Sequence, residues 1–190
     1  MIDAFTLPEK IVGKNVTLIK RDHNFDRQMW EAVERNREFL RTYLFWVDKT
    51  NSFDDVAAAT KLFDLWWAEQ SKFAYVISDK HSQKLLGCID IHNIDLTNCI
   101  AEIGYWLREE KTGFGYMSEA VGLIEAEAFA KGIRRIEISC DEANVASANV
   151  AKRCGYQYEG TQKEAIYTYG EFHNRQIYVK LNPAREKVAA

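Results

Sequence analysis

The sequence predicts a mixed α/β domain in which one sheet is flanked by helices. Stretches that alternate apolar and polar residues, as strands do, are interspersed with stretches whose apolar residues recur at helical spacing. The chain has 190 residues, 47% of them apolar, and this size buries about two-thirds of the surface that the unfolded chain exposes. Its two prolines, Pro8 and Pro183, lie near the ends, and no repeat or linker interrupts it. We therefore expect a single domain over residues 1–190.

The first half of the chain predicts one strand, a group of helices and a hairpin. The β-rich stretch Lys14–Arg21 is the first expected strand. Helical spacing then predicts helices over Phe25–Arg35, Glu38–Phe45 and Asp54–Glu69, the last begun by Asn51 or Ser52 as a cap. Residues 73–95 predict a hairpin whose turn lies near Asp79–Gln83.

The second half alternates strands and helices. Residues Cys99–Leu107 alternate in polarity and predict a half-exposed strand, which is followed by a loop with two glycines. Beyond the loop, a helix is predicted by the spacing of Met117, Ala120, Val121, Ile124 and Ala128, with Gly132 near its end. The remaining expected elements are a strand over Ile133–Cys140, a helix over Val145–Arg153, a strand that starts at residues 156–160 and a strand over His173–Leu181.

Charge and cysteine content exclude some classes of protein. A net charge of −3 and a pI near 5.9 argue against a nucleic-acid-binding protein and are compatible with a positively charged amine as substrate. The four cysteines form no Cys-x-x-Cys pair and have no histidine at zinc-like spacing, so we expect free thiols in a reducing compartment and no metal. The sequence shows neither a signal peptide nor an apolar run of about 18 residues, which predicts a cytoplasmic protein without membrane contact.

The glycine loop is compared with three kinds of phosphate site. A P-loop requires Lys and then Ser or Thr after its last glycine, but Tyr116 and Met117 follow Gly115. The dinucleotide fingerprint is matched only at Gly113 and Gly115, since Ser118 takes the third place. The third possibility is a loop whose amides bind a pyrophosphate at a helix N-terminus, where free N–H groups and the helix dipole favour an anion. A plain strand–helix turn is the alternative without function.

Three segments together resemble a known family. The segments are AEIGYWL, TGFGYMSEA and NVASANVAKRCGY, and in combination they resemble the GNAT superfamily of acetyl-CoA-dependent N-acetyltransferases, most closely its RimJ/RimL-type branch. The resemblance covers nearly the whole chain. It implies a mixed, mostly antiparallel sheet flanked by helices, in which the strands Cys99–Leu107 and Ile133–Cys140 splay apart to admit acetyl-CoA. It also implies acetyl-CoA as cosubstrate, a ribosomal-protein N-terminus as acceptor, and permits a homodimer.

The resemblance assigns a set of residues to acetyl-CoA. The loop frame runs from Thr112 to Met117, and Thr112 departs from the Gln or Arg that the family has there. The family pattern implies that the strand end pairs with the pantetheine arm, that the loop amides bind the pyrophosphate, and that an Asn contacts the pantetheine amides. The residues so assigned are Tyr105, Trp106, Leu107, Thr112, Gly113, Phe114, Gly115, Tyr116, Met117, Ser118, Asn144 and Ser147.

The same resemblance suggests catalytic residues. Glu102 is the first candidate for the general base, and a solvent-facing strand Glu is the alternative. Glu164 is the second candidate, two residues before Ile166, which takes the position of a working glutamate in the RimL-like branch. Ser147 is the candidate general acid, because Ala151 replaces the Tyr that many family members use.

Four residues have a structural alternative beside the functional one. Asn144 and Ser147 are also typical caps of a helix that begins near residue 145. His92 shares a strand face with Asp90 and Cys88, and is expected either at the substrate cleft or as a hydrogen-bonded structural residue. Trp46 is expected in the core or, by resemblance, at the acceptor cleft.

The expected function is transfer of an acetyl group from acetyl-CoA to a primary amine, first of all a protein N-terminal amine. A small-molecule acetyltransferase that acts on a polyamine, amino sugar or antibiotic is an alternative. An acyl-CoA-binding module without turnover is a second alternative, because two residues compete for the role of general base and Thr112 departs from the family pattern.

Overall fold

A computed structural model describes residues 5–184 of the chain. Its strands and helices follow in the order β1 (Lys10–Val12), β2 (Val16–Lys20), α1 (Asp26–Arg35), α2 (Arg37–Arg41), α3 (Phe53–Ala68), β3 (Phe73–Asp79), β4 (Leu85–Asp95), β5 (Ile100–Leu107), α4 (Tyr116–Ala130), β6 (Arg135–Asp141), α5 (Val145–Arg153), β7 (Gln157–Thr168) and β8 (Glu171–Leu181). Short 3-10 helices cover His23–Phe25, Phe45–Lys49 and Glu109–Lys111.

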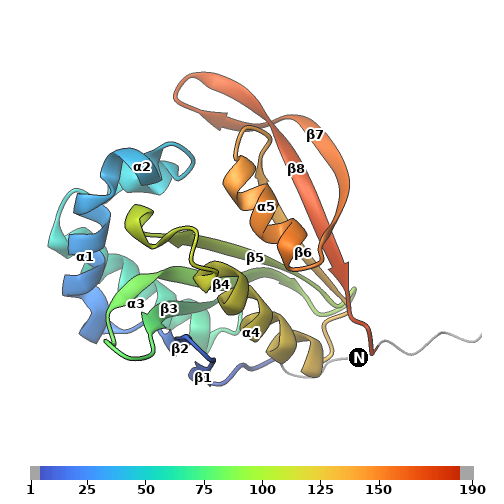
Figure 1. Cartoon of the computed structure of the whole chain (residues 1–190), viewed down its shortest axis with the longest axis horizontal. Helices are drawn as coiled ribbons and strands as arrows, with labels where there is room; N and C mark the ends of the chain where they lie inside the picture. Colours follow the sequence, from blue (N-terminus) through green and yellow to red (C-terminus); the bar gives the residue numbers. More distant parts are fainter. Residues whose placement is uncertain (1–4, 185–190) are drawn as a thin grey trace, which may run out of the picture.

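The eight strands form one sheet in the order β1-β2-β3-β4-β5-β6-β8-β7. Every neighbouring pair is antiparallel except β5 and β6, so the expected mostly antiparallel sheet is confirmed. The parallel pair is short, because Ile100–Glu102 of β5 faces Arg135–Glu137 of β6 and no later residues of the two strands are paired. The sheet therefore opens in its middle, beyond Glu102 (Figure 1).

Helices cover both faces of the sheet. On one face, α4 and α5 lie against it, as the front of Figure 1 shows, and Ile124 and Val121 of α4 are fully buried in the main core. On the other face, α1 and α3 pack on β3 and β4 through a second core that includes Met29, Val56 and Val76. Alternate side chains of β4 therefore point to opposite faces of the sheet. Ile89 and Ile91 enter the main core, while Cys88 contacts the second core.

Most predicted elements are confirmed within a few residues. Ser52 begins α3 with a capping box, in which its side chain accepts the Asp55 N–H while the Asp55 carboxylate accepts the Ser52 N–H. The predicted helix Glu38–Phe45 is wrong at its end, because α2 stops at Arg41 and the chain turns before the 3-10 helix Phe45–Lys49. The strand β1 was not predicted, because with three residues it is too short for its alternation to be visible.

No helix in residues 5–184 is long and apolar enough to cross a bilayer. The cysteines, Cys88, Cys99, Cys140 and Cys154, are free thiols.

Candidate active site

The open middle of the sheet leaves a strand edge without a partner. Residues Ile103–Leu107 of β5 pair with β4 on one side, but among the described residues no strand pairs with their other edge. This edge includes Tyr105, Trp106 and Leu107, the residues assigned to the pantetheine arm. An extended ligand with amide groups fits such an edge, because it can add hydrogen bonds as a further strand does.

The glycine loop ends in a helix N-terminus that has no side-chain cap. Gly113 and Gly115 have φ of +83° and +81°, a conformation that favours glycine, and nothing lies within 4 Å of the position a Cβ would take. Gly115 is the N-cap of α4, and the Glu119 N–H bonds its carbonyl at 3.0 Å. The amides before Glu119 in the first turn are thus left without a partner inside the helix, which is the arrangement that binds phosphate.

The side chains of the loop differ in what they can contribute. The Thr112 hydroxyl donates to the Glu109 carbonyl at 2.8 Å and so stabilises the preceding 3-10 turn. Phe114 is 70% exposed and stacks on Tyr116, with ring centroids 5.9 Å apart. Met117 is buried in the main core, which leaves only its backbone for a ligand.

Ser118 contributes a buried polar atom to the same end of α4. Its Oγ has no hydrogen-bond partner among the described residues. The Ser118 carbonyl is 3.7 Å from the Cys154 Sγ, which joins α4 to the end of α5.

The N-terminus of α5 faces the same opening. Asn144 caps this helix, since its Oδ1 accepts the Ser147 N–H at 3.0 Å, and this leaves the Asn144 side-chain N–H groups free for other partners. The Ser147 Oγ is 3.1 Å from the Tyr105 hydroxyl, so a residue of α5 and one of β5 meet across the opening. Burial raises the pKa of Tyr105, whose hydroxyl therefore keeps its proton. Burial likewise raises the pKa of the nearby Cys140 thiol.

Glu102 lies where β5 and β6 separate, on the sheet face opposite Tyr105. Its carboxylate accepts hydrogen bonds from the Ser139 hydroxyl of β6 and, at 2.9 Å, from the Asn93 side chain. His92, its register partner on β4, approaches it with Nε2 3.7 Å from Oε2. These three contacts hold the carboxylate in a fixed place at the apex of the opening.

Aromatic side chains line the sheet face that carries Glu102. The rings of Trp46 and Trp106 lie 6.0 Å apart, and both pack on the core formed by α1, α2 and the following 3-10 helix. The Tyr43 hydroxyl donates to the Ala143 carbonyl at 3.0 Å, which joins the segment after α2 to the loop after β6.

A second contact on this side of the molecule joins the β7–β8 hairpin to α2. The end of the β7–β8 hairpin reaches toward α2 (Figure 1), where the Tyr169 hydroxyl donates to the Arg41 carbonyl at 3.0 Å. The Arg41 guanidinium also lies 5.3 Å from the Tyr169 ring. The hairpin and α2 thereby bridge over the end of the opening.

Glu164 is placed differently from Glu102. It is exposed, has φ of +51° and lies in the irregular part of β7 between Gln162 and Ile166. Its N–H donates to Asn174 Oδ1 at 3.1 Å. Because β8 lies between β7 and β6, Glu164 is two strands away from the opening.

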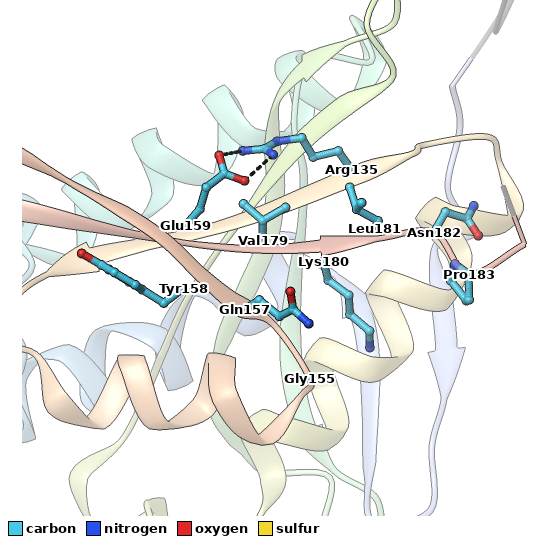
Figure 2. A pocket seen from close by; sticks show the side chains of 10 residues that line it. All are labelled: Arg135, Gly155, Gln157, Tyr158, Glu159, Val179, Lys180, Leu181, Asn182 and Pro183. Atoms are coloured by element: carbon cyan, nitrogen blue, oxygen red, sulfur yellow. Dashed lines mark hydrogen bonds and ion pairs between the residues drawn. The ribbon is translucent and has the colours of Figure 1, made fainter. Parts of the chain in front are cut away.

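A hollow among the described residues lies elsewhere. Figure 2 shows it at the other end of β6, where Arg135 forms paired hydrogen bonds with Glu159 and Lys180 extends on the opposite side of the sheet. Lys180 is bonded in turn to Glu125 at 2.6 Å. Arg135 and Glu159 thus pair with each other, and Lys180 pairs with a residue outside the hollow, so each of these three charged groups already has an ion-pair partner. Within residues 5–184, no cluster of three or more His, Cys, Asp and Glu side chains is arranged to hold a metal.

Sequence reasoning missed part of this site. It did not foresee the Ser139 contact with Glu102 or the Tyr105 contact with Ser147, because each joins elements far apart in the chain. The polar positions that alternate along β6 were the available signal for Ser139. It also missed Arg41 and Tyr169, for which the sequence gives no signal.

A strand pair that opens beside an uncapped helix N-terminus, with a carboxylate at the apex, can hold an extended ligand that carries phosphate next to an acid–base group. The profile of the family described as "Acetyltransferase (GNAT) domain" matches residues 18–157, and the chain belongs to this family. It is an acetyl-CoA-dependent N-acetyltransferase, which excludes the binding module without turnover.

Individual relatives agree with the family. The ribosomal-protein-serine acetyltransferase of Escherichia coli (strain K12) is 27% identical over 171 residues, which are 90% of this chain and 94% of that protein. The structure of RimL, a ribosomal L7/L12 alpha-N-protein acetyltransferase in complex with CoA, matches with a TM-score of 0.88 and 27% identity, over 93% of this chain and 100% of that one.

A third similar structure supports the fold alone. The microcin C7 self-immunity acetyltransferase MccE, in complex with acetyl-CoA and AMP, has a TM-score of 0.85 at 24% identity and covers 89% of this chain and 93% of that one.

Proposed function

We propose that this enzyme acetylates the α-amino group of a protein N-terminus, with a ribosomal protein as the acceptor. The observation that carries this proposal is the similarity to a ribosomal-protein-serine acetyltransferase, in an alignment that covers 90% of the chain. The aromatic face beside Glu102, with Trp46 and Trp106, adds support because it can hold the apolar parts of an N-terminal peptide.

Acetyl-CoA supplies a thioester, whose acetyl group is activated for transfer to an amine. The amides from Gly113 to Ser118 would bind its pyrophosphate, since this helix end has no cap of its own. The free edge of β5 and the Asn144 side chain would bind the pantetheine amides. The open space beside both loop glycines and the unpartnered Ser118 Oγ fit a ligand at this place.

The two faces of the opening suggest two proton-handling groups. Glu102 faces the side with the tryptophans, so it would receive a proton from the acceptor ammonium. Ser147, supported by the protonated Tyr105 hydroxyl, lies on the opposite side and would give a proton to the departing thiol. Glu164 stays the second candidate for the base.

An acceptor panel tests the proposal. We expect CoA release with peptides that carry the N-terminal sequences of ribosomal proteins, and none above background with polyamines, amino sugars or aminoglycosides. Turnover of a small amine in the absence of peptide turnover would overturn the proposed acceptor and favour the small-molecule alternative. Glu102→Gln and Glu164→Gln, assayed side by side, identify the base, because we expect only the former to lower kcat by about 100-fold.

We further propose that the enzyme works in the cytoplasm, since its four cysteines are free thiols. The resemblance also permits a homodimer, which light scattering on the purified protein tests.

A further inference from the structure

A second polar side chain, that of His92, lies next to Glu102 on the same face of the sheet. The His92 Nδ1 lies 2.6 Å from Asp90 Oδ1, while its Nε2 faces the Glu102 carboxylate at 3.7 Å. Asp90 and His92 are two residues apart on β4, so both side chains are on the sheet face that carries Glu102. A carboxylate, an imidazole and a second carboxylate therefore follow one another across two strands.

The far end of this row is anchored by a lysine. The Asp90 Oδ2 lies 3.2 Å from the Lys72 Nζ, so each of the two Asp90 oxygens has its own partner. The positive charge of Lys72 balances the negative charge of Asp90. The Asp90 carboxylate can then accept a hydrogen bond from Nδ1 and so favour the imidazole form that has its proton on Nδ1. With that proton on Nδ1, the Nε2 lone pair is left to face Glu102.

A glycine makes room for the imidazole. Gly104 is the register partner of Asp90 on β5, and a Cβ at Gly104 would lie 3.2 Å from His92 Cε1. The ring thus lies over the backbone of β5 at the point where the strand is open toward β6. A Cβ at position 104 would require the ring to shift by a few tenths of an ångström.

The reaction leaves one proton to be removed. An acceptor ammonium and an acetyl thioester give an amide, a thiol and one proton in excess. Glu102 takes a proton when the N–H bond of the ammonium breaks, and it must lose that proton before the next turnover. Ser139 and Asn93 already donate to the two Glu102 oxygens, and the His92 Nε2 is a base within 4 Å of Oε2 that can take this proton.

We propose that His92 is the proton relay of this enzyme, which takes the proton from Glu102 on Nε2 and passes it to solvent, with Asp90 and Lys72 as the positioning residues. The inference rests on the proposed role of Glu102. Transfer requires Nε2 and Oε2 to approach by about 1 Å to hydrogen-bond distance. His92 is partly exposed, so the proton has a way out. No covalent bond other than N–H and O–H is made or broken in this step.

The charged groups around His92 and its partners come from five places. Asp90 lies on its own strand, Lys72 precedes β3, and Glu102 is on β5. Arg21, which precedes α1, interacts electrostatically with Asp90. On β6, Glu137 is opposite Glu102 but is bonded to Arg135. The surroundings of the imidazole thus contain both signs, which suits a group that changes its charge during turnover.

Kinetics on His92→Gln test the relay, with an amine that the wild type acetylates. We expect kcat to fall by about 10-fold or more at neutral pH, with the KM for acetyl-CoA unchanged. The deficit should shrink as the pH rises, since hydroxide then takes the proton from Glu102. His23→Gln is the matched control, because His23 also bonds a carboxylate at 2.6 Å, that of Asp26, outside the site. A deficit in His92→Gln that is the same at every pH would mean a purely structural role.

Nitrogen NMR of the free enzyme gives a test that needs no activity. The chain has four histidines, and His92→Gln identifies the signals of His92. The relay requires the neutral imidazole to carry its proton on Nδ1, and Asp90→Asn should weaken this preference. A neutral imidazole with its proton on Nε2 would overturn the relay, because Nε2 could then accept no proton from Glu102.

The two tests separate the failure of the relay from the failure of its premises. If Glu102→Gln loses turnover while His92→Gln keeps it at all pH values, Glu102 is the base and the relay is wrong. If the wild type acetylates no peptide but a small amine, the proposed acceptor is wrong and the relay is tested with that amine. If Glu164→Gln is the variant that loses turnover, the premise itself is wrong.

Discussion

Replacing Gly115 with aspartate tests whether the loop before α4 binds phosphate. The backbone at Gly115 has φ of +81°, and a side chain in this conformation costs about 1–2 kcal/mol, with Asp among the residues that tolerate it best. Nothing lies within 4 Å of the new Cβ, so no neighbour has to move. We therefore expect Gly115→Asp to fold, with a Tm lower by about 2–8 °C.

The same substitution places a negative charge at the helix N-terminus. At about 5 Å and an effective dielectric constant of about 40, two phosphate charges repel this carboxylate by about 3 kcal/mol, which weakens CoA binding by about 100-fold. Calorimetric titration with CoA measures the loss. Gly115→Ala is the matched control, since it has the same backbone conformation without the charge. Equal CoA affinity of the two variants would refute the phosphate site at this loop.

Four further predictions concern the opening and the core. Ser147→Ala should lower kcat by about 10-fold or more while acetyl-CoA affinity measured by calorimetry changes far less; equal losses would make Ser147 a binding or capping residue only. Burial raises the pKa of Tyr105, so its hydroxyl stays protonated and the kcat deficit of Tyr105→Phe should be constant across the pH–rate profile. Burial alone would raise the pKa of Glu119, but hydrogen bonds from Asn15 and from the Val16 N–H hold this pKa below its ordinary value. The ionised carboxylate therefore stabilises the fold at pH values above the ordinary pKa, and this contribution is lost as the pH falls through the lowered pKa. Urea unfolding of Glu119→Gln should accordingly show a larger deficit at neutral pH than in acid. Ile124→Ala should cost about 2–5 kcal/mol in the same assay, because it opens a cavity in a fully buried site.

Local signals account for the elements that the sequence predicts well. The helix over Val145–Arg153 is confirmed to the residue, because a capping Asn stands directly before a run of helix-forming residues. Gly132 follows the last turn of α4 with φ of +99°, as a residue after a helix end does. The end of α2 was mispredicted, since its length depends on how the segment Phe45–Lys49 packs on Trp106 and not on local propensity.

In the candidate site, too, one part could be predicted from local sequence signals and another part could not. The glycine loop is a local feature, and its two left-handed glycines before a helix could be foreseen from the sequence. The cluster around Glu102 depends on register, because His92 faces Glu102 only through the pairing of β4 with β5. That register follows an irregularity between His92 and Asp95 and a turn in which Cys99 has φ of +57°. Neither feature has a sequence signal.

The sequence by itself determined the order of the strands and helices after β1, the glycine loop and the resemblance to the GNAT family, since each of these is visible in the residue pattern of individual segments. The resemblance implied that β5 and β6 splay apart, but only the tertiary structure showed that they pair over three residues before they separate. Only the tertiary structure brought Tyr105 to Ser147 on one side of that opening and His92 to Glu102 on the other. The physical reason is that strand pairing and side-chain contacts across a sheet are non-local, so they are fixed by packing of the two cores and not by any one segment.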